Sequence, residues 1–369
     1  MKKLLTVLIA VALVFSFAGC NGSSKGYELA LVTDVGHIDD QSFNQGAYEG
    51  LKAYAEDNKI SYKYYEPAEK STSAYLDAIT LAVDGGAKVV VCPGYLFENA
   101  VWQAQTKFPK VNFVILDGSP HNVTDYTTMA TLDGSAPNFT VATNTYSIFY
   151  KEQQAGFLAG YAAVKDGYTK LGFMGGMAVP AVIRYGYGFV QGADYAAKEL
   201  GIKDVQIKYN YTGTFTASPE IQATAASWFT SGTQVIFACG GGIGNSIMAA
   251  AEANSGKVIG VDVDQSSQSA SVITSAMKGL SASVYSALKD YYNNKFPGGT
   301  SVSLGADVDG VGVPMSTSKF TKFTQADYDK IFAALANDTN GISTAIVTDK
   351  GAATAASLPV TNVKVTLVN

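Results

Sequence analysis

The chain has 369 residues, of which 47% are hydrophobic and 15% charged, and its formal net charge is −5. A chain of this length exceeds one small core, and its composition is that of a folded protein rather than a disordered one. The acidic balance and the lack of a basic run argue against a nucleic-acid partner, because phosphate binding needs clustered Lys and Arg.

The N-terminus has the pattern of a secretory signal. Two lysines precede an apolar stretch, 4–17, which is too short to span a bilayer and ends in the motif FAGC. A cysteine after small residues is typical of bacterial lipoproteins. We therefore expect residues 1–19 to be removed, Cys20 to carry the lipid, and residues 20–26 to form a lipidated tether on the extracytoplasmic face of the cell membrane. An ordinary cleaved signal with an incidental cysteine is the alternative.

The other two cysteines, Cys92 and Cys239, lie in the apolar runs VVVCPG and VIFACGG. Each is interpreted as a small buried hydrophobe rather than as half of a disulfide. The chain has only two histidines and no clustered Cys/His spacing. We therefore expect no metal site and no cofactor.

Strand and helix patterns alternate from residue 27 to residue 117. The expected strands are 27–33, 62–65, 87–92 and 111–117, and the expected helices are 42–58, 73–85 and 98–108. This order predicts a parallel sheet covered by helices on both faces.

A polar, turn-rich interval, 119–138, interrupts this pattern before it restarts. The strands expected beyond it are 139–145, 170–174, 205–209, 234–239, 257–261 and 272–277. The expected helices are 150–165, 181–200, 221–230, 245–254 and 283–294. Beyond these, residues 302–313 alternate between apolar and polar side chains, and a helix is expected at 325–337. The tail, 343–368, has strand character and is broken at 351–357.

Two successive α/β halves predict two Rossmann-like lobes with parallel sheets around a cleft. We assign residues 27–145 plus 270–298 to lobe 1 and residues 146–269 plus 299–369 to lobe 2. The chain then crosses between lobes about three times and forms a hinge, with the later crossings near 262–275 and 295–300.

Candidate ligand-binding residues follow the first strands, because ligands of open α/β sheets sit beyond the carboxyl ends of strands. Asp34 follows the strand 27–33, and Phe43 and Asn44 open the next helix, which Asp39 or Asp40 can cap. A ring at this place can stack on a planar ligand, worth roughly 1–3 kcal/mol, although a core position is the alternative.

The carboxyl ends of later strands supply further candidates. Asp117 and Asp262 end two of these strands, and a carboxylate can accept hydrogen bonds from vicinal hydroxyls; for Asp117 a cap or hinge role is the alternative. Gly241 lies in CGGGIGN, which lacks the Lys-Ser/Thr of a phosphate loop. Phe189 is either a second ring opposite Phe43 or a core aromatic, and Lys278 is either a ligand donor or a solvated lysine.

The sequence offers little for catalysis. It has no G-x-S-x-G elbow, and both histidines, His37 and His121, lie in polar loops without an evident nucleophile. Carboxylates at the strand ends leave a nucleoside hydrolase as an alternative, but such an enzyme needs a tight carboxylate–metal cluster. We therefore expect a binding protein rather than an enzyme.

Several motifs together resemble the basic membrane protein family of substrate-binding lipoproteins, which includes purine nucleoside receptors of ABC transporters. They are VTDVGHIDDQSFNQGAYEGL, GYLFENAVWQAQTKFPKVNFVILDG, FYKEQQAGFLAGYAA, LGFMGG, GGGIGNS and VIGVDVDQ. The similarity runs from residue 27 to at least residue 294. His37 departs from the family pattern, in which a glycine is typical.

The resemblance implies a type I periplasmic-binding-protein fold with a purine between two phenylalanines, which map onto Phe43 and Phe189. It also implies contacts to the base edge and to the ribose hydroxyls. The residues that match are Asp34, Asn44 and Asp117 for the base, and Gly241, Asp262 and Lys278 for the ribose. The implied partners are a purine nucleoside (inosine, guanosine or adenosine), ABC permease subunits, and the membrane through the lipid anchor, with the receptor itself a monomer. A receptor for a sugar or another small metabolite, or a chemosensory receptor, is the alternative.

Overall fold

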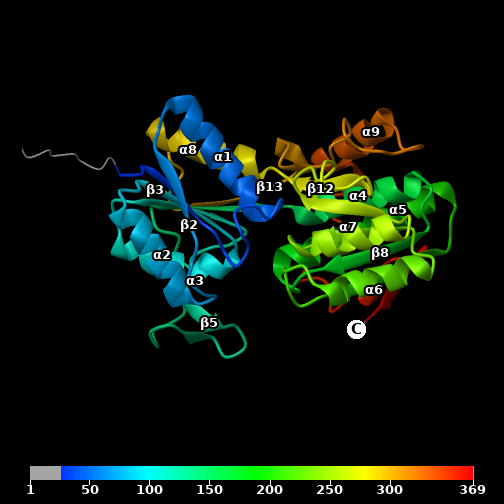
Figure 1. The fold of residues 1–369 in the computed structure, drawn as a ribbon, viewed down its shortest axis with the longest axis horizontal. Coiled ribbons are helices and arrows are strands. Elements are labelled where there is room, and N and C mark those ends of the chain that lie inside the picture. The colour runs from blue at the N-terminus through cyan, green and yellow to red at the C-terminus, as the bar shows by residue number, and fades with distance from the viewer. Residues whose placement is uncertain (1–25, 369) are drawn as a thin grey trace, which may run out of the picture.

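The computed structural model describes residues 26–368. Its elements form two α/β lobes that lie side by side and are joined by a few strand crossings (Figure 1). The expected signal 1–19, the lipidation site Cys20 and all of the tether except Gly26 lie outside the described residues. Within residues 26–368, no helix combines the length and the apolar character needed to cross a membrane.

Lobe 1 is built on a six-stranded parallel sheet in the order β13-β7-β4-β3-β1-β2. Helices α1 and α8 pack on one face of this sheet, and α2 and α3 pack on the other. The strands are β1 (Leu29–Val32), β2 (Tyr62–Tyr65), β3 (Val89–Pro93), β4 (Asn112–Leu116), β7 (Thr145–Tyr150) and β13 (Thr300–Leu304). The helices are α1 (Phe43–Asn58), α2 (Thr72–Asp84), α3 (Glu98–Lys107) and α8 (Leu280–Tyr292), with a short 3-10 turn at Tyr95–Phe97.

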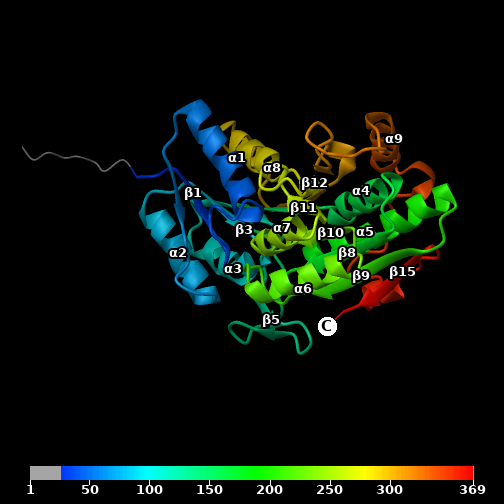
Figure 2. The same cartoon turned by 45° about the vertical axis from the view of Figure 1, so that its right-hand side comes forward.

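Lobe 2 is built on a seven-stranded sheet in the order β14-β12-β11-β10-β8-β9-β15, in which only β14 is antiparallel. Helices α4 and α5 pack on one face, α6 and α7 on the other, and α9 lies against α4. Figure 2 shows β15 at the outer edge of this lobe. The strands are β8 (Lys170–Gly175), β9 (Val205–Tyr211), β10 (Val235–Cys239), β11 (Lys257–Asp262), β12 (Val272–Lys278), β14 (Val311–Gly312) and β15 (Val363–Leu367). The helices are α4 (Glu152–Lys165), α5 (Pro180–Leu200), α6 (Pro219–Thr230), α7 (Ile243–Ala253) and α9 (Gln325–Ala336), with 3-10 turns at Ala306–Val308, Thr339–Gly341 and Ala355–Ser357.

Helices α4 and α5 pack backbone to backbone through glycines. A methyl group on Gly156 or Gly160 of α4 would lie 2.0 Å from a carbonyl oxygen of α5. The same holds in reverse, because a methyl group on Gly188 or Gly192 of α5 would lie 2.0 Å from a carbonyl oxygen of α4. No side chain fits at any of the four positions, so these two helices form one rigid unit.

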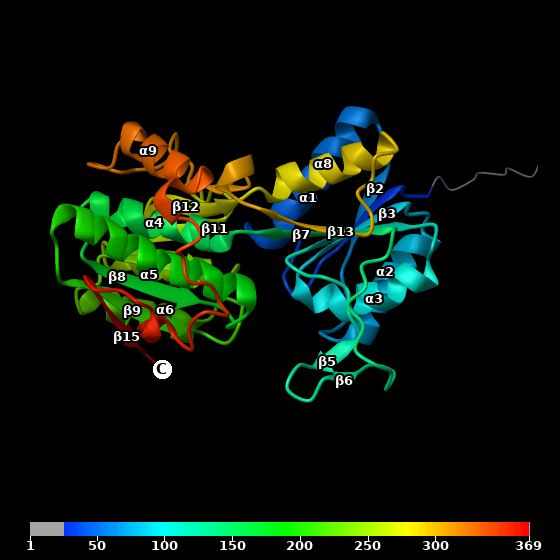
Figure 3. The same ribbon diagram turned by 180° about the vertical axis from the view of Figure 1, so that it is seen from behind.

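The chain crosses between the lobes three times, the number expected from the sequence, but at different places. The crossings lie between β7 and α4, between β12 and α8, and between β13 and the 3-10 turn at Ala306–Val308 (Figure 3). Consequently, residues 146–150 and 300–304, expected in lobe 2, are in the sheet of lobe 1. Residues 270–278, expected in lobe 1, contain β12, which pairs with β11 in lobe 2.

The alternation of strands and helices is otherwise as the sequence predicts, with three local differences. The strand expected at 139–145 is β7, which begins only at Thr145 and extends into the expected start of a helix. The interval 119–138 contains a small hairpin, β5 (Val123–Asp125) and β6 (Ala130–Thr131), which projects from lobe 1. The tail 343–368 forms a strand only at β15.

Candidate ligand-binding site

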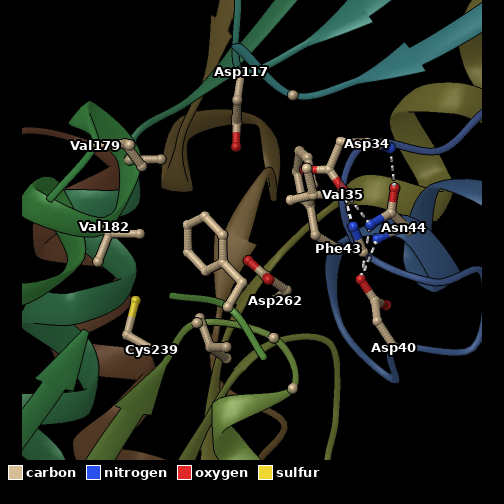
Figure 4. A pocket seen from close by; sticks show the side chains of 18 of the residues that line it. Asp34, Val35, Asp40, Phe43, Asn44, Asp117, Val179, Val182, Cys239 and Asp262 are labelled. Carbon is tan, nitrogen blue, oxygen red and sulfur yellow. Dashed lines mark hydrogen bonds between the residues drawn. The ribbon is translucent and has the colours of Figure 1, made fainter. Parts of the chain in front are cut away.

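A cavity of about 460 Å³ lies between the two lobes (Figure 4). Its walls come from the segments that follow β1, β3 and β4 in lobe 1 and the segments at the ends of β8, β9, β10, β11 and β12 in lobe 2. The carboxyl ends of both sheets therefore face one cavity, as expected for a doubly wound fold. The volume is in the range of small-molecule sites.

At the lobe 1 wall, three polar side chains form a fixed network (Figure 4). The Asn44 amide group donates to Asp34 Oδ1 at 2.8 Å and to Asp40 Oδ2 at 3.0 Å, and its Oδ1 accepts from the Asp34 backbone N–H at 3.2 Å. Both amide hydrogens of Asn44 are thus used within the protein. Asn44 lines the cavity, but in this arrangement it orients Asp34 rather than offering a donor to a ligand.

Asp34 is the acceptor that this network holds in place. Its Oδ1 accepts from Gly36 N–H at 2.7 Å and from Asn44, whereas no hydrogen bond within residues 26–368 reaches its Oδ2. Burial raises the pKa of Asp34, and the bonds from Gly36 and Asn44 oppose this rise. One carboxylate oxygen therefore remains for a donor on a ligand.

Asp40 rather than Asp39 caps helix α1. Its carboxylate accepts from the backbone N–H groups of Ser42 at 2.9 Å, Asn44 at 3.0 Å and Gln45 at 3.1 Å. These bonds satisfy N–H groups that have no partner within the helix. The cap fixes the first turn of α1, which carries the half-buried ring of Phe43 into the cavity lining.

Lys278, at the end of β12, lies at the centre of a buried charge cluster. Its Nζ forms an ion pair with Asp117 of lobe 1 and lies 3.6 Å from Asp262 Oδ1 and 3.8 Å from Glu152 Oε1. It also lies 4.4 Å from the ring centroid of Phe43. The alternative of a solvated surface lysine is wrong, because Lys278 is only 5% exposed.

The electrostatics of the cluster follow from burial and from these neighbours. Burial lowers the pKa of Lys278, but the carboxylates around it outweigh this effect and raise the pKa overall. Arg184 Nε donates to Glu152 Oε2 at 2.6 Å. Burial opposes ionisation of Glu152, yet Arg184 and Lys278 hold its pKa below the usual range. The cluster therefore keeps both cations charged, although Lys278 is buried and the Arg184 side chain is only 16% exposed.

Asp117 and Glu152 each have one carboxylate oxygen that is buried without a hydrogen-bond partner within residues 26–368. In Asp117 this oxygen is Oδ1. Burial raises the pKa of Asp117 to about 7, with Glu152 adding to the rise and Lys278 opposing it. Asp117 therefore titrates near neutral pH in the folded protein.

This titration predicts a pH-dependent stability. Between its ordinary pKa of 3.8 and about 7, Asp117 holds a proton in the folded state that it loses in the unfolded state. The free energy of unfolding should thus fall as the pH rises through this range. In Asp117→Asn, urea unfolding at about pH 5 and about pH 8 should show a smaller fall than in the wild type. Equal falls in both proteins would contradict the assignment.

The remaining lobe 2 candidates divide into two kinds. Asp262 and Gly241 line the cavity, and both have a positive φ, of 67° and 55°. Phe189 does not line it: the side chain is completely buried in the core, with its ring centroid 5.4 Å from that of Phe237. The prediction that Phe189 is a second ring in the cleft is therefore wrong.

Phe215, in the loop after β9, lines the cavity instead. The sequence prediction did not include Phe215, although it lies among small polar residues, TGTFTAS, shortly after the predicted strand 205–209. Tyr185 of α5 also lines the cavity, and its hydroxyl donates to Asp262 Oδ1 at 3.4 Å.

The two histidines lie apart, one at the cavity and one beside the β5–β6 hairpin. His37 lies at the edge of the cavity with an 83% exposed side chain, 4.0 Å from Glu66. His121 is buried below the β5–β6 hairpin, 3.0 Å from Glu98. In the described part of the chain, no three His, Cys, Asp or Glu side chains are grouped in a way that suits a metal ion.

Comparisons with known proteins agree with this architecture. Residues 27–344 match the family model Bmp, described as "ABC transporter substrate-binding protein PnrA-like". The chain is 30% identical to the "ABC transporter nucleoside-binding protein BmpA" of Lactococcus lactis, over 86% of this chain and 94% of the relative. It is 29% identical to "Basic membrane protein A2" of Borrelia garinii, over 91% and 95%.

Solved structures show the same fold at low sequence identity. An ABC transporter solute-binding protein from Aeropyrum pernix K1 superposes with a TM-score of 0.65 at 22% identity, covering 85% of this chain and 86% of the other. A second one, from Conexibacter woesei, has a TM-score of 0.64 at 20% identity and covers 85% and 96%. The fold is thus of the type I periplasmic-binding class, and the chain belongs to the Bmp family of PnrA-like ABC transporter substrate-binding proteins.

Proposed function

We propose that the protein binds purine nucleosides in the cavity between its lobes. The observation that carries this proposal is the composition of the cavity wall. It combines two rings that can stack on a planar base, Phe43 and Phe215, with carboxylates that accept from N–H and hydroxyl groups, Asp34 and Asp262. The name of the Lactococcus lactis relative, a nucleoside-binding protein, supports the same ligand class.

In this proposal each polar group has a separate role. The free oxygen of Asp34 accepts from a donor on the base edge. Asp262 accepts from ribose hydroxyls, to which Lys278 and the backbone N–H of Gly241 donate. Asp117 acts through Lys278, to which it is bonded. Closure of the lobes stabilises the complex, because the ligand contacts both walls only in the closed form.

We further propose that the receptor is anchored by a lipid on Cys20 and delivers its ligand as a monomer to an ABC permease. Family membership supports transport, and the motif FAGC supports the anchor. Metabolic labelling with a fatty acid, compared between the wild type and Cys20→Ala, tests the anchor directly. Equal labelling of both proteins would contradict it.

Calorimetry with inosine, guanosine, adenosine and uridine tests the ligand class, with D-ribose as the control for a sugar receptor. We expect binding of the purine nucleosides and recovery of intact nucleoside by chromatography afterwards. Binding of ribose but of no nucleoside would favour a sugar receptor. Release of free base would instead show a nucleoside hydrolase.

The charge of the cavity predicts that nucleotides bind worse than nucleosides. The lining holds five aspartates, Asp34, Asp39, Asp40, Asp117 and Asp262, but only one lysine, which is already paired. A phosphate would approach these carboxylates at a cost of about 1 kcal/mol for each charge pair at 4 Å even in water. Calorimetry should therefore give an affinity for inosine 5′-phosphate about tenfold or more below that for inosine. Equal affinities would contradict this charge argument.

A further inference from the structure

Ser42 occupies the N-cap position of α1 but does not cap the helix. Serine at this position usually accepts a hydrogen bond from the first turn. Here the carboxylate of Asp40 accepts those backbone N–H groups instead. The Ser42 hydroxyl is thereby released, although the side chain is completely buried.

The released hydroxyl bonds to the opposite lobe. Ser42 Oγ, in lobe 1, donates to Asp262 Oδ2, in lobe 2, at 2.6 Å. Asp262 is only 7% exposed, so this charge-assisted bond is shielded from water. This bond links the two lobes at a place separate from the three crossings of the chain.

A second contact between the lobes flanks this bond. Gln265 Nε2 and Gln268 Nε2 both donate to the carbonyl oxygen of Gln41, at 2.9 and 3.1 Å. The side chain of Gln265 is itself fixed, because its Oε1 accepts from the Val261 backbone N–H at 3.0 Å. The backbone N–H of Gln265 donates to Ser275 Oγ at 3.0 Å. The start of α1 is therefore tied to the loop between β11 and β12.

The Ser42 bond and the ion pair with Lys278 use different oxygens of the Asp262 carboxylate. Asp262 Oδ1 lies 3.6 Å from Lys278 Nζ and 3.4 Å from the Tyr185 hydroxyl, while Oδ2 is held by Ser42. Without Ser42, the carboxylate is free to turn both oxygens towards Lys278. With Ser42 in place, the carboxylate is fixed in one rotamer and Oδ1 is the oxygen left for a ligand hydroxyl.

We propose that Ser42 is a positioning residue that sets the Asp262 carboxylate for the vicinal hydroxyls of the ligand and ties it to the ring of the adjacent Phe43. This inference rests on the proposed nucleoside function. The aromatic platform lies in lobe 1 and the hydroxyl acceptor in lobe 2, so a direct bond between the two walls fixes their spacing. Ser42 acts through Asp262 and does not itself contact the ligand.

The test compares inosine with 2′,3′-dideoxyinosine, which has the same base but no vicinal hydroxyls, by calorimetry. In Ser42→Ala we expect binding of inosine to weaken about tenfold, and binding of the dideoxy compound to change little. Ser42→Thr, which keeps the hydroxyl, should restore the preference for inosine. Ser147→Ala is the matched control, because Ser147 is equally buried and its hydroxyl has no hydrogen-bond partner among residues 26–368.

Equal weakening for both ligands in Ser42→Ala would show a purely structural role and overturn the inference, as would no weakening at all. If the wild type binds neither ligand, the nucleoside assignment and the hydroxyl-positioning role both fail. The bond between Ser42 and Asp262 can then be tested without ligand, by comparing radii of gyration from small-angle scattering. A larger radius of gyration for Ser42→Ala than for Ser147→Ala would support this bond, and equal radii would refute it.

Discussion

Replacing Lys278 with methionine should lower the free energy of unfolding by about 3–5 kcal/mol and abolish ligand binding. The reason is that Asp117, Asp262 and Glu152 all face this one ammonium group. Removing it leaves Asp117 and Asp262 buried without this counter-charge, whereas Glu152 keeps Arg184, and the loss is far larger than that of an exposed ion pair. Urea unfolding and calorimetry measure the two effects.

The matched control is Lys88→Met, which breaks an ion pair of 2.8 Å with Glu28 on the surface. An exposed pair of this kind contributes only about 0.2–1 kcal/mol. The double variant Lys278→Met/Asp117→Asn should recover part of the lost stability, because it removes one of the stranded carboxylates. If Lys278→Met lowers the free energy of unfolding no more than Lys88→Met does, the buried cluster does not contribute the stability expected of it.

Replacing Phe43 with alanine should weaken nucleoside binding by roughly 5- to 150-fold, which corresponds to about 1–3 kcal/mol of stacking on an aromatic side chain. The loss should be similar for inosine, guanosine and adenosine, because every purine presents a flat face. Phe43→Trp should retain most of the affinity. Calorimetry with the three nucleosides gives these values.

Two controls separate stacking from other causes. Phe139→Ala removes a 49% exposed ring outside the cavity lining and should leave the affinity unchanged. Phe43→Leu keeps an apolar side chain beside Lys278 but removes the flat ring, so it should bind nearly as weakly as Phe43→Ala. Full affinity in Phe43→Leu would mean that the site needs an apolar contact and not a stacking partner.

The sequence predicts the segments of the fold better than their assignment to lobes. Alternating apolar strands and amphipathic helices are local patterns, and they identify most elements to within a few residues. Which sheet a buried strand joins depends on distant partners. Residues 272–278 have the apolar character of a buried strand in either lobe, so the pattern could not show that β12 pairs with β11.

The same distinction applies to the site. Asp34, Asp117 and Asp262 could be placed in the cavity because each follows a recognisable strand, and the carboxyl ends of parallel strands face one edge. Phe189 could have been excluded, since it shares a helical stripe with Ala193 and Ala196 of α5, which are buried and lie outside the cavity lining. The helical spacing of apolar residues along α5 is the signal that places Phe189 in the core.

Side-chain pairings within the site lay beyond sequence reasoning. Whether Asn44 bonds to a ligand or to Asp34 depends on distances of a few tenths of an ångström, which no pattern encodes. The bond between Ser42 and Asp262 joins residues 220 positions apart, and it depends on Asp40 having replaced Ser42 as the helix cap.

The glycine contact between α4 and α5 bears on attempts to re-engineer this receptor. Tyr185 and Arg184 belong to α5, and Glu152 begins α4, so a spread of the two helices would displace all three side chains together. A mutant library aimed at new ligands can vary the loop 215–217, which makes part of the cavity wall. The codons for Gly156, Gly160, Gly188 and Gly192 should be held constant in such a library, because even alanine there would force the helices apart.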